Sequence, residues 1–251
     1  MVKVILWDID GTLLDFKQSE YDAVKKCFEI FHMGNCTDEM IERYSNINAK
    51  YWERLERGEI TKEQTLIGRF EEFFASEGLT VQKAQAFNKE YQIRLGDKVF
   101  FNDDANAFIL ELKSKVKQYA VTNGTLAAQS RKLAKSGLDT LLDGTFISDE
   151  IGVEKPNIEF FNHVFGEIKK AGTSQEHLRN DEIMIVGDSL TSDMQGGNNA
   201  GILCCWYNPK GTKNTRDLKI DYEIRNLKEV IALIEEDRLQ AVYEKIDSQS
   251  L

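Results

Sequence analysis

Hydrophobic residues of this chain gather in short runs that are typical of buried β-strands. Five such runs lie at residues 3–8, 117–122, 145–148, 183–187 and 202–206. Apolar residues between the later runs recur at the i, i+3, i+4, i+7 spacing of a helix, as in Ala105, Phe108, Ile109 and Leu112. Strands that alternate with helices predict a doubly wound α/β fold, in which helices cover both faces of a parallel sheet.

Residues 17–94 interrupt this alternation. They are rich in Glu, Lys and aromatic residues and contain no convincing strand, so they predict an all-helical domain inserted after the first strand. Its apolar inner surface is expected to come from Phe28, Phe31, Tyr51, Trp52, Leu55, Phe70, Phe73 and Phe74. The chain would then consist of a core, residues 1–16 and 95–251, and a helical domain, residues 17–94. A strand near 222–224 and a helix around 230–234 are expected to complete the core.

Composition narrows the class of protein. The 251 residues are enough for one large domain or for a core with a modest insert. The net charge of −10 argues against binding to a nucleic-acid polymer, and it means that a site for an anion must build its own positive centre. No apolar stretch approaches about 20 residues, and the N-terminus lacks a secretory signal, so no membrane span is expected. The four cysteines form no CxxC pair, which favours a reduced cytoplasmic protein. We expect a monomer or a weak homodimer.

The first apolar run ends in two carboxylates, Asp8 and Asp10, which are followed by Gly11 and Thr12. Side chains at i and i+2 of an extended chain point to the same side, so these two acids would crowd each other. A bound divalent cation relieves such repulsion, and oxygen ligands suit magnesium. The alternative is a strand that runs into an ordinary acidic turn, with Gly11 supplying a positive φ.

Two later runs also end in polar residues. Thr122, Asn123 and Gly124 follow the second run, and their hydroxyl, amide and backbone N–H groups could hold a phosphate ahead of a helix. Asp188 directly follows the fourth run, and Asp193 lies five residues further on. Each segment alone has an ordinary alternative, a turn in the first case and a helix N-cap in the second.

Lys155 is the fourth candidate, and it stands directly before Pro156. Pro156 is expected in the first turn of a helix, whose buried side chains would be Phe161, Val164, Phe165 and Ile168. A lysine in this position is more often solvated. The carboxyl ends of parallel strands meet at one edge of a sheet, however, so the four segments together predict a single site there.

The order of these segments, DxDGT, Thr-Asn, Lys-Pro and GDxxxxD, resembles the four motifs of the haloacid dehalogenase superfamily over nearly the whole chain. That resemblance implies a Rossmann-like core with an inserted helical cap that closes over the site. Residues 44–70, 147–157 and 196–201 further resemble the bacterial pyrimidine 5′-nucleotidase (YjjG-like) branch. They include Asn48, Trp52 and the stretches Gly58-Glu59-Ile60-Thr61 and Gly68-Arg69-Phe70.

The resemblance implies a magnesium-dependent phosphomonoester hydrolase. Asp8 would attack phosphorus and form an aspartyl-phosphate, and Asp10 would act as general acid and then as general base. Magnesium would be held by Asp8, the backbone carbonyl of Asp10 and Asp188, with Asp193 orienting the metal's surroundings rather than binding directly.

The resemblance also assigns charge stabilisation and substrate contacts. Lys155 and Thr122, with the N–H groups around Asn123 and Gly124, would stabilise the transferring phosphoryl oxygens. Trp52 and Asn48 could stack on and hydrogen-bond a base, or they could be structural. The expected substrate is a nucleoside 5′-monophosphate, with pyrimidine preferred.

Other functions share much of this pattern. A broad sugar-phosphate or phosphoglycolate phosphatase, or a phosphosugar mutase, would carry the same catalytic residues. A 2-haloacid dehalogenase would need neither magnesium nor an acid at Asp10, so the full acidic set favours phosphoryl transfer. A binding module without catalysis would be expected to have lost one of these residues, and none is missing.

Overall fold

The computed structural model describes residues 1–171 and 178–249. The chain forms two compact units. The first contains Met1–Leu14, Phe101–Asn123 and Leu138–Leu251, and the second contains Asp15–Phe100 and Gly124–Gly137. The second unit therefore contains the predicted helical segment 17–94 and also residues 15–16, 95–100 and 124–137, which the sequence analysis assigns to the core.

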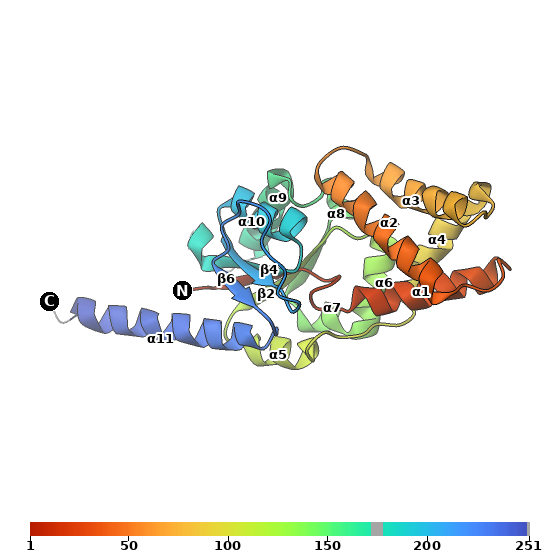
Figure 1. The fold of residues 1–251 in the computed structure, drawn as a ribbon. Coiled ribbons are helices and arrows are strands. Elements are labelled where there is room, and N and C mark those ends of the chain that lie inside the picture. The colour runs from red at the N-terminus through yellow and green to blue at the C-terminus, as the bar shows by residue number, and fades with distance from the viewer. Residues whose placement is uncertain (172–177, 250–251) are drawn as a thin grey trace. The chain divides into compact units, whose positions relative to one another are not determined.

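A six-stranded, fully parallel sheet forms the centre of the first unit (Figure 1). Its strands are β1 (Val4–Trp7), β2 (Lys117–Thr122), β3 (Gly144–Ile147), β4 (Ile183–Gly187), β5 (Leu203–Tyr207) and β6 (Tyr222–Ile224). Their order in the sheet is β3-β2-β1-β4-β5-β6, so β1 lies in the interior of the sheet, between β2 and β4. The predicted doubly wound α/β fold is confirmed, and each predicted apolar run is a strand.

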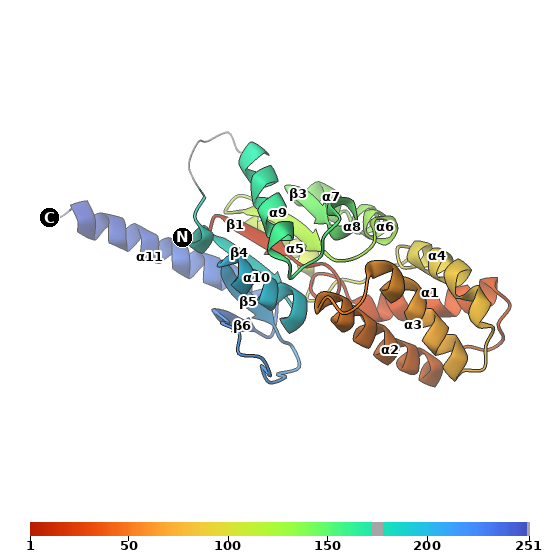
Figure 2. The ribbon, with the colours of Figure 1, turned by 90° about the horizontal axis from the view of Figure 1, so that it is seen from above.

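Helices cover both faces of this sheet. The helices of the first unit are α5 (Ala105–Leu112), α7 (Leu138–Leu141), α8 (Ser148–Ile151), α9 (Ile158–Ala171), α10 (Gln195–Ala200) and α11 (Glu229–Gln249). Two views show α9 and α10 on one face and α5 on the other (Figures 1 and 2). Alternate residues of β1 serve the two faces, because Leu6 packs in the cluster with α9 while Trp7 contacts Phe108 of α5.

The start of α9 differs from the sequence prediction. The sequence predicts Pro156 in its first turn, but α9 begins two residues later, at Ile158. Asn157 accounts for this start, because its side chain accepts a hydrogen bond from the backbone N–H of Glu159. The buried face of α9 is as predicted for Phe161, Val164 and Ile168, and Phe165 is partly buried beside them.

The second unit is helical in all its described elements. These are α1 (Phe16–Ile30), α2 (Asp38–Glu56), α3 (Lys62–Ser76), the short 3₁₀ turn η1 (Val81–Lys83), α4 (Ala84–Arg94) and α6 (Leu126–Ser136). Thr37 caps α2, and Thr61 with Gln64 forms a reciprocal capping box at the start of α3. The core of the second unit is a cluster of aromatic rings that includes Phe28, Phe70, Phe73, Phe74 and Phe87.

All four cysteines are buried free thiols, so none is in a disulfide. Among the described residues, no helix is both long and apolar enough to cross a membrane.

Candidate active site

The carboxyl end of β1 carries Asp8, which is largely buried. Its backbone N–H donates to the carbonyl of Val186 in β4 at 2.9 Å, which fixes it beside the end of the neighbouring strand. The chain then turns tightly at Gly11, whose φ is +97°. A Cβ atom at Gly11 would lie 2.7 Å from the carboxylate of Asp188, so only glycine allows this approach.

Lys155 joins the ends of β1, β2 and the loop after β4. Its Nζ donates to Asp8 Oδ1 at 2.8 Å, to Asp193 Oδ1 at 2.6 Å and to the carbonyl of Val121 at 2.8 Å. These three bonds use all three ammonium hydrogens. The side chain is only 1% exposed, so Lys155, which the four segments together predict in this site, is a buried cation between two carboxylates.

Three carboxylates meet at this point. Oxygen atoms of Asp8, Asp188 and Asp193 all lie within 4.8 Å of one another. If all three are ionised, the single ammonium of Lys155 leaves a formal charge of −2. A hard divalent cation would neutralise that charge, and carboxylate oxygens are the ligands that magnesium prefers, so these residues fit a magnesium site.

The pKa values of the cluster reflect this crowding. Burial, followed by the charge of Asp193, raises the pKa of Asp8 to about 7, against the lowering effect of Lys155. Asp188 is an exposed residue by surface area, yet desolvation of its carboxyl group and the charges of Asp8 and Asp193 raise its pKa well above the ordinary value. Burial lowers the pKa of Lys155, but the charges of Asp193 and Asp8 outweigh it and raise that pKa above its usual range.

Asp193 is held on both carboxylate oxygens. Oδ1 accepts from Lys155, and Oδ2 accepts from the backbone N–H of Ser189 at 3.1 Å. Its carboxylate lies so close to Gly187 that a Cβ there would meet it at 2.3 Å. Asp193 lies in a π-helical turn, η3 (Leu190–Met194), which Ser189 caps by accepting from the N–H groups of Thr191 and Ser192.

The end of β2 contributes the remaining predicted core residues. Thr122 is fully buried at the last position of the strand. The side chain of Asn123 bonds the backbone of Lys155 twice, accepting from its N–H and donating to its carbonyl, both at 2.8 Å. Asn123 therefore holds the main chain of Lys155. Gly124 follows directly in sequence and falls in the second unit.

Two residues of this site were not predicted individually. Thr12 Oγ1 accepts from the backbone N–H of Asp188 at 3.0 Å and lies 3.2 Å from Asp188 Oδ1. Trp206 of β5 donates its indole N–H to the Asp188 carbonyl at 2.9 Å. The position of Thr12 in the DxDGT motif could have indicated its contact with Asp188. No local sequence pattern around Trp206 indicates that it contacts Asp188.

Residues 2–201 match the sequence model of the haloacid dehalogenase-like hydrolases. The chain belongs to this family. The HAD-hydrolase YfnB of Bacillus subtilis is 33% identical over 92% of this chain and 95% of its own length. A crystal structure of YfnB, described as bound to magnesium and as revealing interdomain movement, gives a TM-score of 0.84 at 31% identity and covers 93% of this chain and 98% of that one.

Two nucleotidases are also similar to this hydrolase. The pyrimidine 5′-nucleotidase PynA of Streptococcus pneumoniae is 31% identical over 96% of this chain and 98% of its own. The pyrimidine 5′-nucleotidase YjjG of Escherichia coli is 27% identical over 92% of this chain and 96% of its own. The predicted membership of the haloacid dehalogenase superfamily is thus confirmed.

The helical unit of the hydrolase contains the other two predicted site residues, Asn48 and Trp52. Asn48 is buried, and it donates to Glu20 Oε1 at 2.8 Å while its oxygen accepts from Arg69 Nη1 at 2.6 Å. Burial raises the pKa of Glu20, although its hydrogen bonds lower it. Trp52 is half-buried, with the Arg69 guanidinium 5.9 Å from its ring centroid. Arg69 therefore contacts both Asn48 and the Trp52 ring and links the two side chains.

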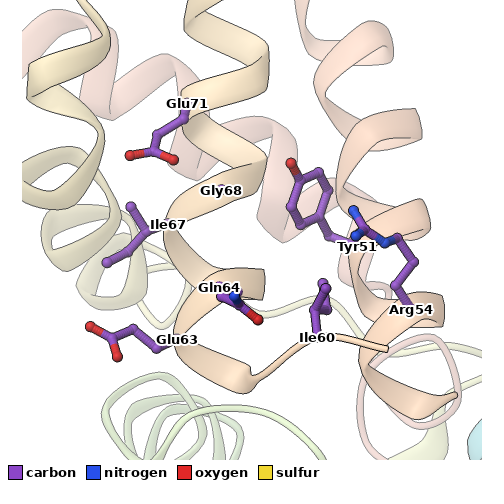
Figure 3. Close-up of a pocket in the computed structure, with 8 residues that line it drawn as sticks. All are labelled: Tyr51, Arg54, Ile60, Glu63, Gln64, Ile67, Gly68 and Glu71. Carbon is purple, nitrogen blue, oxygen red and sulfur yellow. The ribbon is translucent and has the colours of Figure 1, made fainter. Parts of the chain in front are cut away.

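The helical unit also has a groove of about 390 Å³ between the end of α2 and the start of α3 (Figure 3). It is lined by Tyr51, Arg54, Ile60, Glu63, Gln64, Ile67, Gly68 and Glu71. A Cβ at Gly68 would meet the Tyr51 ring at 2.8 Å, so this glycine admits the ring. Arg54 lies over the Tyr51 ring and Gln64 caps α3, so both groups have partners within the unit.

Proposed function

We propose that this haloacid dehalogenase-like hydrolase is a magnesium-dependent phosphomonoester hydrolase that forms an aspartyl-phosphate on Asp8. The observation that carries the proposal is the arrangement at the end of β1. Asp8 shares a buried ammonium with Asp193 and lies within 4.8 Å of Asp188. A nucleophilic carboxylate, a fixed cation and a cluster of oxygen donors are the parts that phosphoryl transfer needs.

Asp8, Asp188 and the backbone carbonyl of Asp10 are the groups that would hold the metal. When bound, Mg²⁺ neutralises negative charge on the nucleophile and the phosphoryl oxygens. Asp193 has one carboxylate oxygen bonded to Lys155 and the other to Ser189, which favours an orienting role over direct ligation. This assignment agrees with the division of roles that the family resemblance implies.

The first step transfers the phosphoryl group to Asp8. A carboxylate oxygen of Asp8 forms a bond to phosphorus while the bond from phosphorus to the ester oxygen breaks. Asp10, two residues further along, gives its proton to the departing alkoxide. Lys155, Thr122 and the backbone N–H groups after β2 stabilise the equatorial oxygens, where charge is spread in the transition state.

The second step regenerates the enzyme. Asp10, now ionised, takes a proton from water, and the water oxygen bonds to phosphorus as the bond to Asp8 breaks. Inorganic phosphate leaves, and Asp10 holds the proton that the next cycle needs. The acid at Asp10 distinguishes this scheme from a 2-haloacid dehalogenase, in which no leaving alkoxide needs a proton.

The preferred substrates are pyrimidine nucleoside 5′-monophosphates. This part of the proposal is supported by the similarity to two pyrimidine 5′-nucleotidases over more than nine tenths of the chain. In the helical unit, Trp52 offers a half-buried indole for stacking on a base, and Asn48 acts on it by holding Arg69.

Phosphate release from a panel of nucleotides, sugar phosphates and phosphoglycolate tests the proposal. We expect release to need Mg²⁺, to stop in excess chelator and to be lost in Asp8→Asn, with UMP and dTMP preferred. Circular dichroism serves as the folding control. Full turnover by folded Asp8→Asn would overturn the mechanism. A tenfold or greater preference for phosphosugars, about 1.4 kcal/mol in the transition state, would overturn the substrate assignment alone.

A further inference from the structure

Asn102 is the second residue of the first unit after the chain returns from segment 15–100. Its backbone N–H donates to the carbonyl of Leu13 at 3.0 Å, and the preceding residue, Phe101, forms an antiparallel bridge with Leu14. The segment that enters this unit at 101–102 is therefore paired with the segment that leaves it at 13–14.

The side chain of Asn102 extends this pairing into the turn after β1. Its Nδ2 donates to the carbonyl of Thr12 at 2.8 Å and lies 3.3 Å from the carbonyl of Gly11. Both carbonyls belong to the turn that carries the DxDGT residues. One amide group thus fixes two successive peptides of this turn.

The same turn lies directly beside Asp188. A Cβ at Gly11 would lie 2.7 Å from the Asp188 carboxylate, and the Thr12 hydroxyl accepts from the Asp188 N–H and lies within hydrogen-bond distance of its carboxylate. A shift of the Gly11–Thr12 peptides would therefore move the surface that orients Asp188. A hydrogen-bonded path runs from Asn102 through Thr12 to the carboxylate.

We propose that Asn102 is a positioning residue for the metal site, which sets the orientation of Asp188 through the carbonyls of Gly11 and Thr12. This inference rests on the proposed magnesium-dependent function. Groups that orient a metal ligand without touching the metal typically change metal affinity by about 10- to 100-fold when replaced. Asn102 is one contact further out than Thr12, so we expect the lower end of this range.

Isothermal titration of Mg²⁺ into Asn102→Ala and the wild type tests the role directly, without turnover. We expect about a tenfold weaker affinity in Asn102→Ala. Asn102→Asp should weaken binding further, because its carboxylate would face two carbonyl oxygens. Asn102→Ser, which keeps one donor, should fall between the wild type and alanine. If Asn102→Ala does not fold, the Mg²⁺ affinity of Asn102→Ser still tests the proposal.

Asn180→Ala is the matched control. Asn180 likewise donates its Nδ2 to a backbone carbonyl, that of Ala200 at 2.9 Å, but it precedes β4 and so lies at the opposite end of that strand from Asp188. We expect this control to lose thermal stability in the metal-free state and to bind Mg²⁺ within about twofold of the wild type. Activity of Asn102→Ala should recover as Mg²⁺ is raised, with KM for substrate unchanged at saturating metal.

The outcomes separate the two proposals. Wild-type protein that binds no Mg²⁺ would overturn the proposed function and this inference together. Wild-type protein that binds Mg²⁺, with both Asn102→Ala and Asn102→Asp binding equally well, would overturn this inference alone. An equal loss of affinity in Asn180→Ala would also overturn it, because the effect would then be one of general stability.

Discussion

The ammonium of Lys155 donates to the carboxylate of Asp8 at 2.8 Å, although the two residues are 147 positions apart in sequence. Asp193 takes a second ammonium hydrogen at 2.6 Å, and the carbonyl of Val121 takes the third. A buried lysine is stable only when its hydrogens are accepted and its charge is balanced. Lys155 meets both conditions through residues at the ends of β1 and β2 and in the turn after β4, so it links the three segments of the candidate site.

Replacing Lys155 by Met should abolish activity and destabilise the metal-free protein. Removal of one partner from a buried ion pair costs about 3–5 kcal/mol, because it leaves Asp8 and Asp193 uncompensated. Urea unfolding at about pH 8 should show this loss, and the loss should shrink at about pH 5.5, where protonation relieves the repulsion. Lys117→Met is the control, since Lys117 pairs with Asp143 while 66% exposed, and about 1 kcal/mol or less is expected. Equal losses in the two variants would contradict this account.

Replacing Asp10 by Asn should leave Mg²⁺ binding intact and lower turnover by about 10²–10⁴-fold, the usual contribution of general acid–base catalysis. The loss should be smaller for p-nitrophenyl phosphate, because its leaving group needs no proton. Burst kinetics on both substrate classes separate the first chemical step from the second. If the first step slows by the same factor for both classes, Asp10 does not protonate the leaving group.

Magnesium affinity should rise with pH. The pKa of Asp8 is raised to about 7 and that of Asp188 is raised as well, so metal binding at about pH 6 must displace protons. Because these pKa values are raised, the stability that the protonated carboxyls contribute to the metal-free fold is lost as pH increases through about 7. Mg²⁺ should offset that loss, so the metal-induced rise in Tm should grow between about pH 6 and pH 8.

Calorimetry in two buffers of different ionisation enthalpy measures the proton count directly. At about pH 6 we expect the release of about one proton or more for each Mg²⁺ that binds. At about pH 8 the carboxyls are already ionised, so we expect much less proton release. Affinity that stays flat over this range would contradict the assignment of these two carboxylates to the metal site.

Replacing Asn48 and Trp52 by Ala should have different effects. Asn48→Ala leaves buried Glu20 and Arg69 without their shared partner, so we expect a stability loss of about 1–3 kcal/mol. Trp52→Ala should instead lower kcat/KM for UMP and spare p-nitrophenyl phosphate. Tyr51→Ala is the control, because Tyr51 neighbours Trp52 in sequence but lines the α2–α3 groove. If only Tyr51→Ala selectively lowers kcat/KM for UMP, the base contacts the α2–α3 groove and not Trp52.

Local patterns in the sequence were sufficient for the sheet and for the positions of the acidic residues. Apolar runs mark β1, β2 and β4, and Asp8, Thr122 and Asp188 stand at or next to the ends of these strands. Strand burial depends on residues that are neighbours in the chain, and parallel strands bring their carboxyl ends together by topology. The α/β class, the family and the convergence of four segments could therefore be predicted without coordinates.

Tertiary structure decided what each side chain touches. The sequence predicts Lys155 in the site, but only the packing shows that its ammonium is buried and bonded to Asp8 and Asp193. The sequence left Asn48 open as a base contact, and the structure places its amide between Glu20 and Arg69 in the interior. Asn123, which the sequence predicts as part of the phosphate site, holds the main chain of Lys155 with its side chain. Asn102, which no local pattern distinguishes from a turn residue, holds the turn beside Asp188. Hydrogen bonds between residues tens of positions apart depend on how strands and loops pack, and hydrophobic periodicity carries no information about that geometry.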